Sequence, residues 1–140
     1  MRDAVALPIV ELPGGDSFAA RNLERVPESA ELARSLVRGA LESWGLLRMG
    51  EPARVVVTEL VSNAVRHAQG DGLRVTVVRL SPERVRIGVV DRDRTRPQVK
   101  PMSLDAESGR GLVLVEAMSS VWGVDLLPGG KEVWADLEAV

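Results

Sequence analysis

The chain has 140 residues, 45% of them hydrophobic, and a formal net charge of −2, which fits one globular domain. It has no cysteine and its only histidine is His67, which excludes disulfides, thiolate metal sites and multi-histidine metal sites. The acidic balance argues against direct binding of nucleic acid. The lack of a long apolar run or signal peptide favours a cytoplasmic protein without a membrane span.

The first half of the chain predicts strands followed by two helices. A strand is expected over 4–10, and residues 17–26 are expected to form a second strand or an irregular segment. Helices over 27–44 and 52–69 are indicated by apolar residues at helical spacing, with a proline at each start and a glycine after each end.

The second half predicts two hairpins, separated by a long loop and a third helix. Apolar and polar residues alternate over 72–80 and 84–90, and the last hairpin is expected over 121–127 and 132–137. Residues 92–108 lack periodicity and are expected to form a loop, followed by a helix over 111–119. This order predicts one α+β domain, a two-layer sandwich with helices on one face of an antiparallel or mixed, mostly antiparallel sheet.

A polar stripe is expected on the second helix. Glu59, Asn63 and His67 follow one another at four-residue spacing, beside the apolar arc of that helix. Asn63 offers an oxygen ligand suited to Mg²⁺, and Glu59 can act as a general base or orient a water molecule. The alternative is a solvated helix face on which His67 closes the helix end.

An aspartate follows the strand expected over 84–90. Asp91, with Asp93 and Pro97 after it, ends this strand, and a carboxylate there can accept a hydrogen bond from an amine such as that of adenine. The alternative is an acidic turn at the end of a strand.

A pair of glycines precedes the third expected helix. Gly109 and Gly111 flank Arg110, and glycines allow backbone N–H groups to approach an anion closely. The start of a helix adds positive potential, and the guanidinium of Arg110 matches the geometry of a phosphate. A Gly-x-Gly pattern alone also fits a tight loop.

The order and spacing of these three motifs resembles the GHKL ATPase superfamily, and within it the compact anti-sigma-factor serine kinases. The likeness is carried by residues 58–68 and 107–112 and by the terminal segment 129–134, and it spans roughly residues 17–138. It implies the Bergerat-type ATP-binding fold, a two-layer α/β sandwich, with ATP and Mg²⁺ as ligands.

The resemblance also implies a role for each matching position. Asn63 would hold Mg²⁺, Glu59 would be the base or orient water, and Asp91 would read the adenine amine, under a lid formed by residues 92–108. The other residues implied to contact the nucleotide are His67, Asp93, Pro97, Gly109, Arg110, Gly111 and Leu112. The last four of these would face the phosphates, partly through their backbone.

The implied activity is transfer of the γ-phosphoryl group of ATP to a serine of an antagonist (anti-anti-sigma) protein, by a protein that also binds a sigma factor. Homodimers are common in that family, although this sequence carries no signature of one. A non-catalytic ATP-binding module is the first alternative. No glycine lies between Gly88 and Gly109, and Glu132 stands where many members have a threonine that helps to hold the nucleotide. The resemblance therefore implies a carboxylate close to the nucleotide, which is expected to weaken its binding.

A helix-turn-helix DNA-binding protein is the second alternative. Two helices separated by the glycine at position 45 fit it superficially, but their connection exceeds the usual turn of about 3–4 residues, and the chain is acidic.

Overall fold

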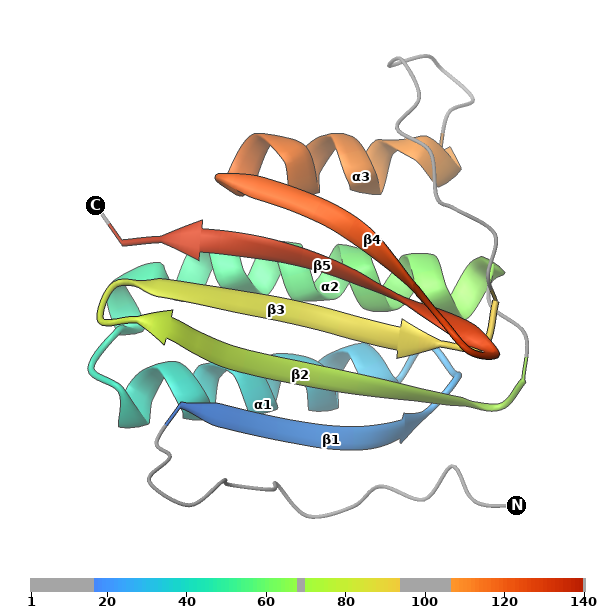
Figure 1. Cartoon of the computed structure of the whole chain (residues 1–140), viewed down its shortest axis with the longest axis horizontal. Helices are drawn as coiled ribbons and strands as arrows, with labels where there is room; N and C mark the ends of the chain where they lie inside the picture. The colour runs from blue at the N-terminus through green and yellow to red at the C-terminus, as the bar shows by residue number, and fades with distance from the viewer. Residues whose placement is uncertain (1–16, 68–69, 94–106, 140) are drawn as a thin grey trace.

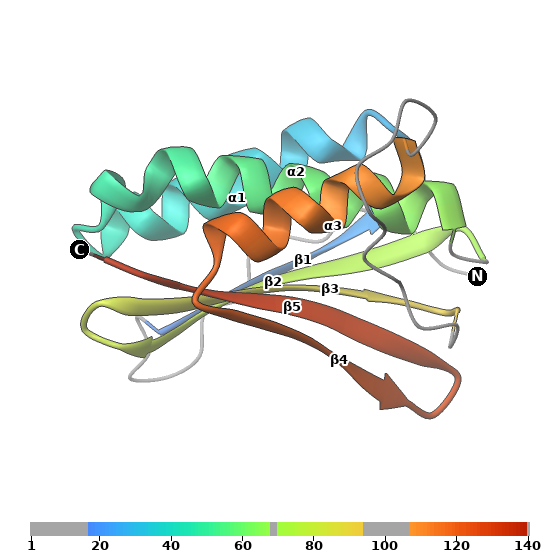
Figure 2. The ribbon, with the colours of Figure 1, turned by 90° about the horizontal axis from the view of Figure 1, so that it is seen from above.

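The computed structural model describes residues 17–67, 70–93 and 107–139, and of residues 107–110 only the backbone. In these ranges a five-stranded sheet is covered on one face by three α-helices (Figures 1 and 2). This confirms the expected α+β sandwich with its helices on one side. No helix in the described part of the chain is long and apolar enough to cross a membrane.

The strands pair in the order β1-β2-β3-β5-β4, and all four pairings are antiparallel. The strand bounds are β1 (Phe18–Glu24), β2 (Gly72–Ser81), β3 (Arg84–Asp91), β4 (Val121–Leu127) and β5 (Gly130–Glu138). Both expected hairpins are confirmed, and the segment 17–26 contains the strand β1 over Phe18–Glu24. The strand expected over 4–10 lies outside the described residues.

The helices are α1 (Ser29–Ser43), α2 (Gly50–His67) and α3 (Glu107–Met118). A short 3-10 turn, η1 (Leu47–Met49), which the sequence did not predict, joins the first two. The expected starts of α1 and α2 agree with the structure to within two residues. The expected start of α3 at residue 111 is wrong, because the helix begins at Glu107.

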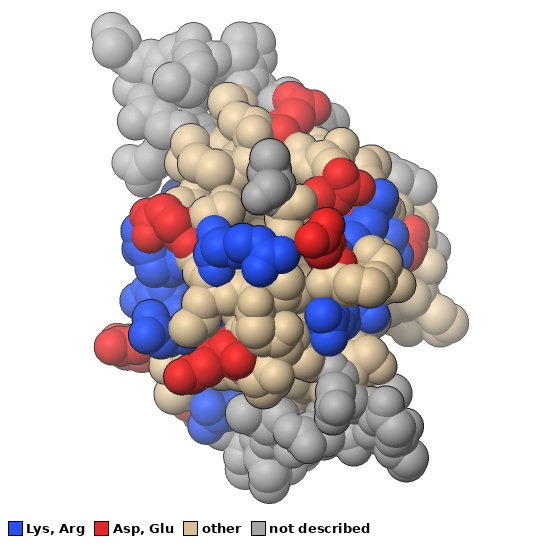
Figure 3. Space-filling model, turned by 90° about the vertical axis from the view of Figure 1, so that its left-hand side faces the viewer, with Lys and Arg blue, Asp and Glu red and all other residues tan. Residues whose placement is uncertain are grey.

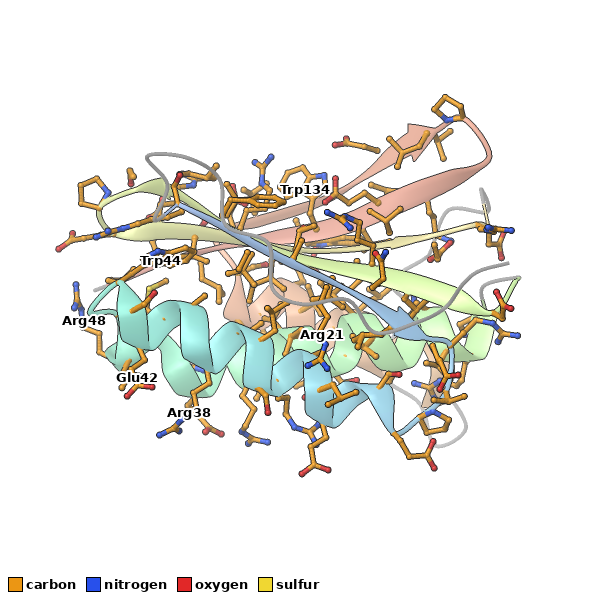
Figure 4. The ribbon with its side chains drawn as sticks, turned by 90° about the horizontal axis from the view of Figure 1, so that it is seen from below. Arg21, Arg38, Glu42, Trp44, Arg48 and Trp134 are labelled. Atoms are coloured by element: carbon orange, nitrogen blue, oxygen red, sulfur yellow. The ribbon has the colours of Figure 1, made fainter. Side chains whose placement is uncertain are left out.

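The core lies between the helices and one face of the sheet. Side chains alternate across a strand, so β3 presents Val85, Ile87 and Val89 to the helices, all nearly inaccessible to solvent. Leu60 of α2 packs into this core. Trp44, next to the end of α1, lies on the helix side of the sheet (Figure 4). The packing fixes which residues of each strand face the helices.

The opposite face of the sheet carries a layer of aromatic and charged side chains. Trp134 of β5 lies on this side (Figure 4), over Gly123, where an added Cβ would lie 2.6 Å from the indole ring. The guanidinium of Arg86 stacks 4.0 Å from the ring centroid of Trp134. Asp136, with no exposed surface, accepts hydrogen bonds from Arg84 and Arg86.

The arrangement of α1 and α2 differs from that of a helix-turn-helix. The two helices run side by side in opposite directions along the sheet, whereas a helix-turn-helix crosses at about 90–120° (Figures 1 and 2). The end of the molecule near the β2–β3 turn carries interspersed basic and acidic side chains (Figure 3), including the pair Arg48–Glu83. The described residues at that end therefore form no continuous basic surface for DNA.

Candidate functional site

Three chain segments that carry the predicted site residues meet at one end of the molecule. The last turns of α2, the end of β3 and the start of α3 lie at the same end in both views (Figures 1 and 2). Antiparallel pairing of β2 with β3 and the return of the chain through α3 bring them there. The three motifs therefore lie at one end of the molecule.

Glu59 and Gly111 are in direct proximity. A Cβ added to Gly111 would lie 2.6 Å from Oε1 of Glu59, so only glycine leaves this carboxylate undisturbed in its place. Gly111 is buried and Glu59 is partly buried. The α2 motif and the glycine motif therefore lie against each other in the structure.

The glycine pair lies inside α3 and not before it. Because the helix begins at Glu107, Gly109 and Arg110 belong to its first turn, although glycine is a poor helix former. The first four N–H groups of a helix have no partner within it and carry positive potential. The backbone around Gly109 is therefore suited to an anion, whereas the side chain of Arg110 is outside the description.

Leu112 follows Gly111 but its side chain is only 1% exposed. It packs inward, so only its backbone is available to a ligand.

Asn63 is partly buried one turn after Glu59, and His67 is exposed at the last residue of α2. The described side chain that closes this helix end is Arg25, whose guanidinium donates to the carbonyl oxygens of Val65 (2.7 Å) and Gly70. A cation there satisfies helix carbonyls and the helix dipole. The sequence prediction assigned that role to His67 and missed Arg25.

Asp91 is 5% exposed at the end of β3. Its Oδ1 accepts hydrogen bonds from the ammonium of Lys131 (3.0 Å) and from the backbone N–H of Asp93 (2.8 Å). Asp93 therefore acts on Asp91 through its backbone. Pro97 and most of the expected lid over 92–108 lie outside the described residues.

The sequence analysis did not identify Lys131 as a site residue, and it placed Glu132 close to the nucleotide. Lys131 is the Cα partner of Asp91 in the β3–β5 pairing, so both side chains point toward the helix side of the sheet. Glu132 points to the opposite face, where it lies over Gly88 and accepts a hydrogen bond from Thr76 at 3.4 Å. The expected closeness of Glu132 to the nucleotide is therefore wrong.

Asp91 also borders a cavity of about 690 Å³ at this end of the sheet. Its described lining comes from the ends of β1, β2 and β3 and from the β4–β5 turn, without any residue of α2 or α3. This cavity is therefore distinct from the region where Glu59 and Gly111 meet.

The residues present fit a magnesium–nucleotide ligand. The absence of a Cβ at Gly111 allows the carboxylate of Glu59 to lie against α3, and the first turn of this helix carries N–H groups of the kind that bind anions. Within the described residues no three His, Asp or Glu side chains cluster in a metal cage. Mg²⁺ is often held by one or two protein oxygens and by substrate phosphates, an arrangement that Asn63 could serve.

Replacing Gly130 with alanine is expected to lower the free energy of unfolding by about 3 kcal/mol, measured by urea denaturation. A Cβ there would overlap the backbone oxygen of Asp91, which cannot move without shifting the strand. Gly39→Ala in α1 is the control, because nothing lies within 4 Å and alanine is the better helix former by about 1 kcal/mol. Equal effects of the two changes would contradict the close approach at Gly130.

The family model of the histidine kinase-like ATPase domain matches residues 21–137, which is most of the chain. No curated protein matches the sequence.

Proposed function

Because the chain belongs to the histidine kinase-like ATPase family, a family of ATP-binding domains, we propose that it is a serine/threonine protein kinase of the anti-sigma-factor type. In this proposal it works in the cytoplasm, binds a sigma factor, and transfers the γ-phosphoryl group of ATP to a serine of an antagonist protein. The observation that supports catalysis most directly is the carboxylate of Glu59 beside Gly111.

Each part of the site has a role in this proposal. The backbone of the first turn of α3 binds the phosphates, and Asp91 accepts a hydrogen bond from the adenine amine. Glu59 takes the proton of the serine hydroxyl as its oxygen attacks the γ-phosphorus and ADP leaves. Asn63 holds Mg²⁺, which supplies charge neutralisation at the phosphates.

A non-catalytic ATP-binding module remains the second candidate. Its sequence support is the absence of glycine between Gly88 and Gly109. The second argument for it, a carboxylate beside the nucleotide, is lost because Glu132 lies on the other face of the sheet.

The proposed metal role predicts that Asn63→Ala loses the magnesium-dependent part of ATP affinity. Calorimetric titration with ATP in Mg²⁺ and in EDTA should show tighter binding with metal for the wild type. The variant should bind equally in both, a loss of about tenfold or 1.4 kcal/mol. Equal magnesium dependence in the two proteins would reject the assignment of Asn63.

Ser62→Ala is the matched control for this experiment. Ser62 is the neighbouring residue but points elsewhere, since it lines a surface pocket with Pro27 and Val65. Its ATP affinity and magnesium dependence should equal those of the wild type.

A further inference from the structure

Lys131 is a buried cation at the site that the family assignment does not explain. Its relative exposure is 3%, and its Nζ donates to Oδ1 of Asp91 (3.0 Å) and to the backbone oxygen of Asp93 (2.6 Å). Removing an ammonium from water is costly unless it is paired and hydrogen-bonded, so these two contacts are needed to keep it inside. The start of β5 is therefore tied to the carboxylate at the end of β3.

The two carboxylate oxygens of Asp91 differ in the hydrogen bonds that they accept. Oδ1 receives both the ammonium of Lys131 and the N–H of Asp93. Within residues 17–67, 70–93 and 107–139, no donor reaches Oδ2. A carboxylate has lone pairs on both oxygens, so Oδ2 is available as an acceptor for a ligand.

Among the described residues, the neighbouring charged side chains Glu132 and Arg92 do not share this role. Glu132 faces the other side of the sheet, where it bonds Thr76. Arg92 is exposed, and its side chain lies against Gly70, whose added Cβ would be 3.0 Å from its Cδ. Lys131 is thus the cation that the described contacts place on Asp91.

We propose that Lys131 is a positioning residue that fixes Asp91 as a hydrogen-bond acceptor, with Oδ2 directed to the base amine, and so makes the site select adenine over 6-oxopurines. This inference rests on the proposed function, in which Asp91 reads the base. It assigns the selectivity to a residue pair, of which Asp91 touches the ligand and Lys131 acts through Asp91.

The selectivity follows from donor and acceptor chemistry. A charged carboxylate only accepts hydrogen bonds, so it pairs with the amine of adenine and repels the 6-oxo oxygen of hypoxanthine. Without the ammonium of Lys131, Oδ1 of Asp91 loses its side-chain partner, and Oδ2 is no longer held in place for the amine. Removing Lys131 should therefore weaken binding of ATP more than binding of inosine triphosphate.

The test compares calorimetric affinities for ATP and inosine triphosphate. The wild type should prefer ATP by about 100-fold, and Lys131→Met should reduce this ratio at least about tenfold. Glu132→Gln is the matched control, one residue along the same strand but on the other face, and it should keep the ratio within about threefold. Failure of the wild type to bind ATP would overturn the proposed function together with this inference. ATP binding with no preference over inosine triphosphate, or with an unchanged ratio in Lys131→Met, would overturn the inference alone.

A second measurement uses the wild-type protein and does not depend on the variant folding. The sequence has only two lysines, Lys100 and Lys131, so ¹⁵N-lysine NMR resolves their ammonium signals, with Lys100→Arg for assignment. The signal of Lys131 should be observable, as expected for a buried, hydrogen-bonded ammonium, and should persist at saturating ATP. An absent signal in the free protein, or its loss when ATP binds, would show that Lys131 does not hold Asp91 during recognition and would overturn the proposal.

Discussion

Replacing Asp136 with alanine is expected to lower the free energy of unfolding by about 3 kcal/mol, because it removes the carboxylate shared by a buried ion-pair cluster. Asp136 is fully buried and bonds Arg86 at 2.6 Å through Oδ1 and Arg84 at 2.8 Å through Oδ2. Both arginine side chains are 35% exposed, so their charged groups can be solvated in the variant. The expected loss of unfolding free energy therefore lies at the lower end of the usual range of about 3–5 kcal/mol for breaking a buried ion pair. Urea denaturation measures the change.

Glu138→Ala is the matched control, because the same guanidinium of Arg84 also bonds Glu138 at 2.8 Å. The side chain of Glu138 is 50% exposed, so its loss should cost less than about 1 kcal/mol. Similar losses for Asp136→Ala and Glu138→Ala would contradict the importance of burial in this cluster.

The same cluster makes stability depend on pH in acid. Burial opposes ionisation of Asp136, but hydrogen bonds from Arg86 and Arg84 outweigh it and hold its pKa below the ordinary value of 3.8. Its contribution is therefore complete above about pH 3.8 and is lost as pH falls through the lower folded-state value. The difference in urea midpoint between wild type and Asp136→Asn should shrink over that acid range.

The pKa of Glu132 is shifted in the opposite direction to that of Asp136, so the two contributions to the pH dependence of stability must be distinguished. Burial is the main cause that raises its pKa above the ordinary value of 4.5, with the charge of Asp125 acting in the same direction. Its contribution is present at low pH and is lost as pH rises through the raised value. Both proteins in the comparison with Asp136→Asn contain Glu132, so its effect largely cancels in their difference.

The fold was predictable because the local patterns agree with one another. Helical spacing predicted α1 and α2, and alternation predicted the hairpin β2–β3 with its short turn. The start of α3 was not predictable in the same way. Gly109 and Gly111 have low helix propensity, and the packing of Gly111 against Glu59 is a tertiary contact that sequence spacing does not reveal.

The polar pair Lys131–Asp91 was missed because it depends on strand register. Alternation along β5 does carry a usable signal. Lys131 has the same parity as Val133 and Ala135, which face the helices, whereas Glu132 has the parity of Trp134. Parity would have placed Glu132 away from the site, but only the pairing of β3 with β5 puts Lys131 opposite Asp91.

Replacing Glu59 with glutamine is expected to slow phosphoryl transfer by about 10²–10⁴-fold, the usual contribution of a general base. Glutamine keeps the shape of the side chain beside Gly111 but cannot take the proton of the attacking hydroxyl. Affinity for ATP should change less than about threefold, because the proton is transferred only in the reaction. Transfer from γ-labelled ATP to candidate antagonist proteins of the same organism measures the rate.

Glu51→Gln is the matched control, since Glu51 lies in the first turn of the same helix, is exposed and pairs with Arg54. It should leave the transfer rate unchanged. A wild-type protein that binds ATP and its antagonist but transfers no phosphate would reject the kinase and favour the non-catalytic module. Transfer at equal rates in the wild type and Glu59→Gln would support the kinase hypothesis but would show that Glu59 is not the general base. The kinase and the non-catalytic module differ in whether phosphoryl transfer occurs and not in whether ATP binds.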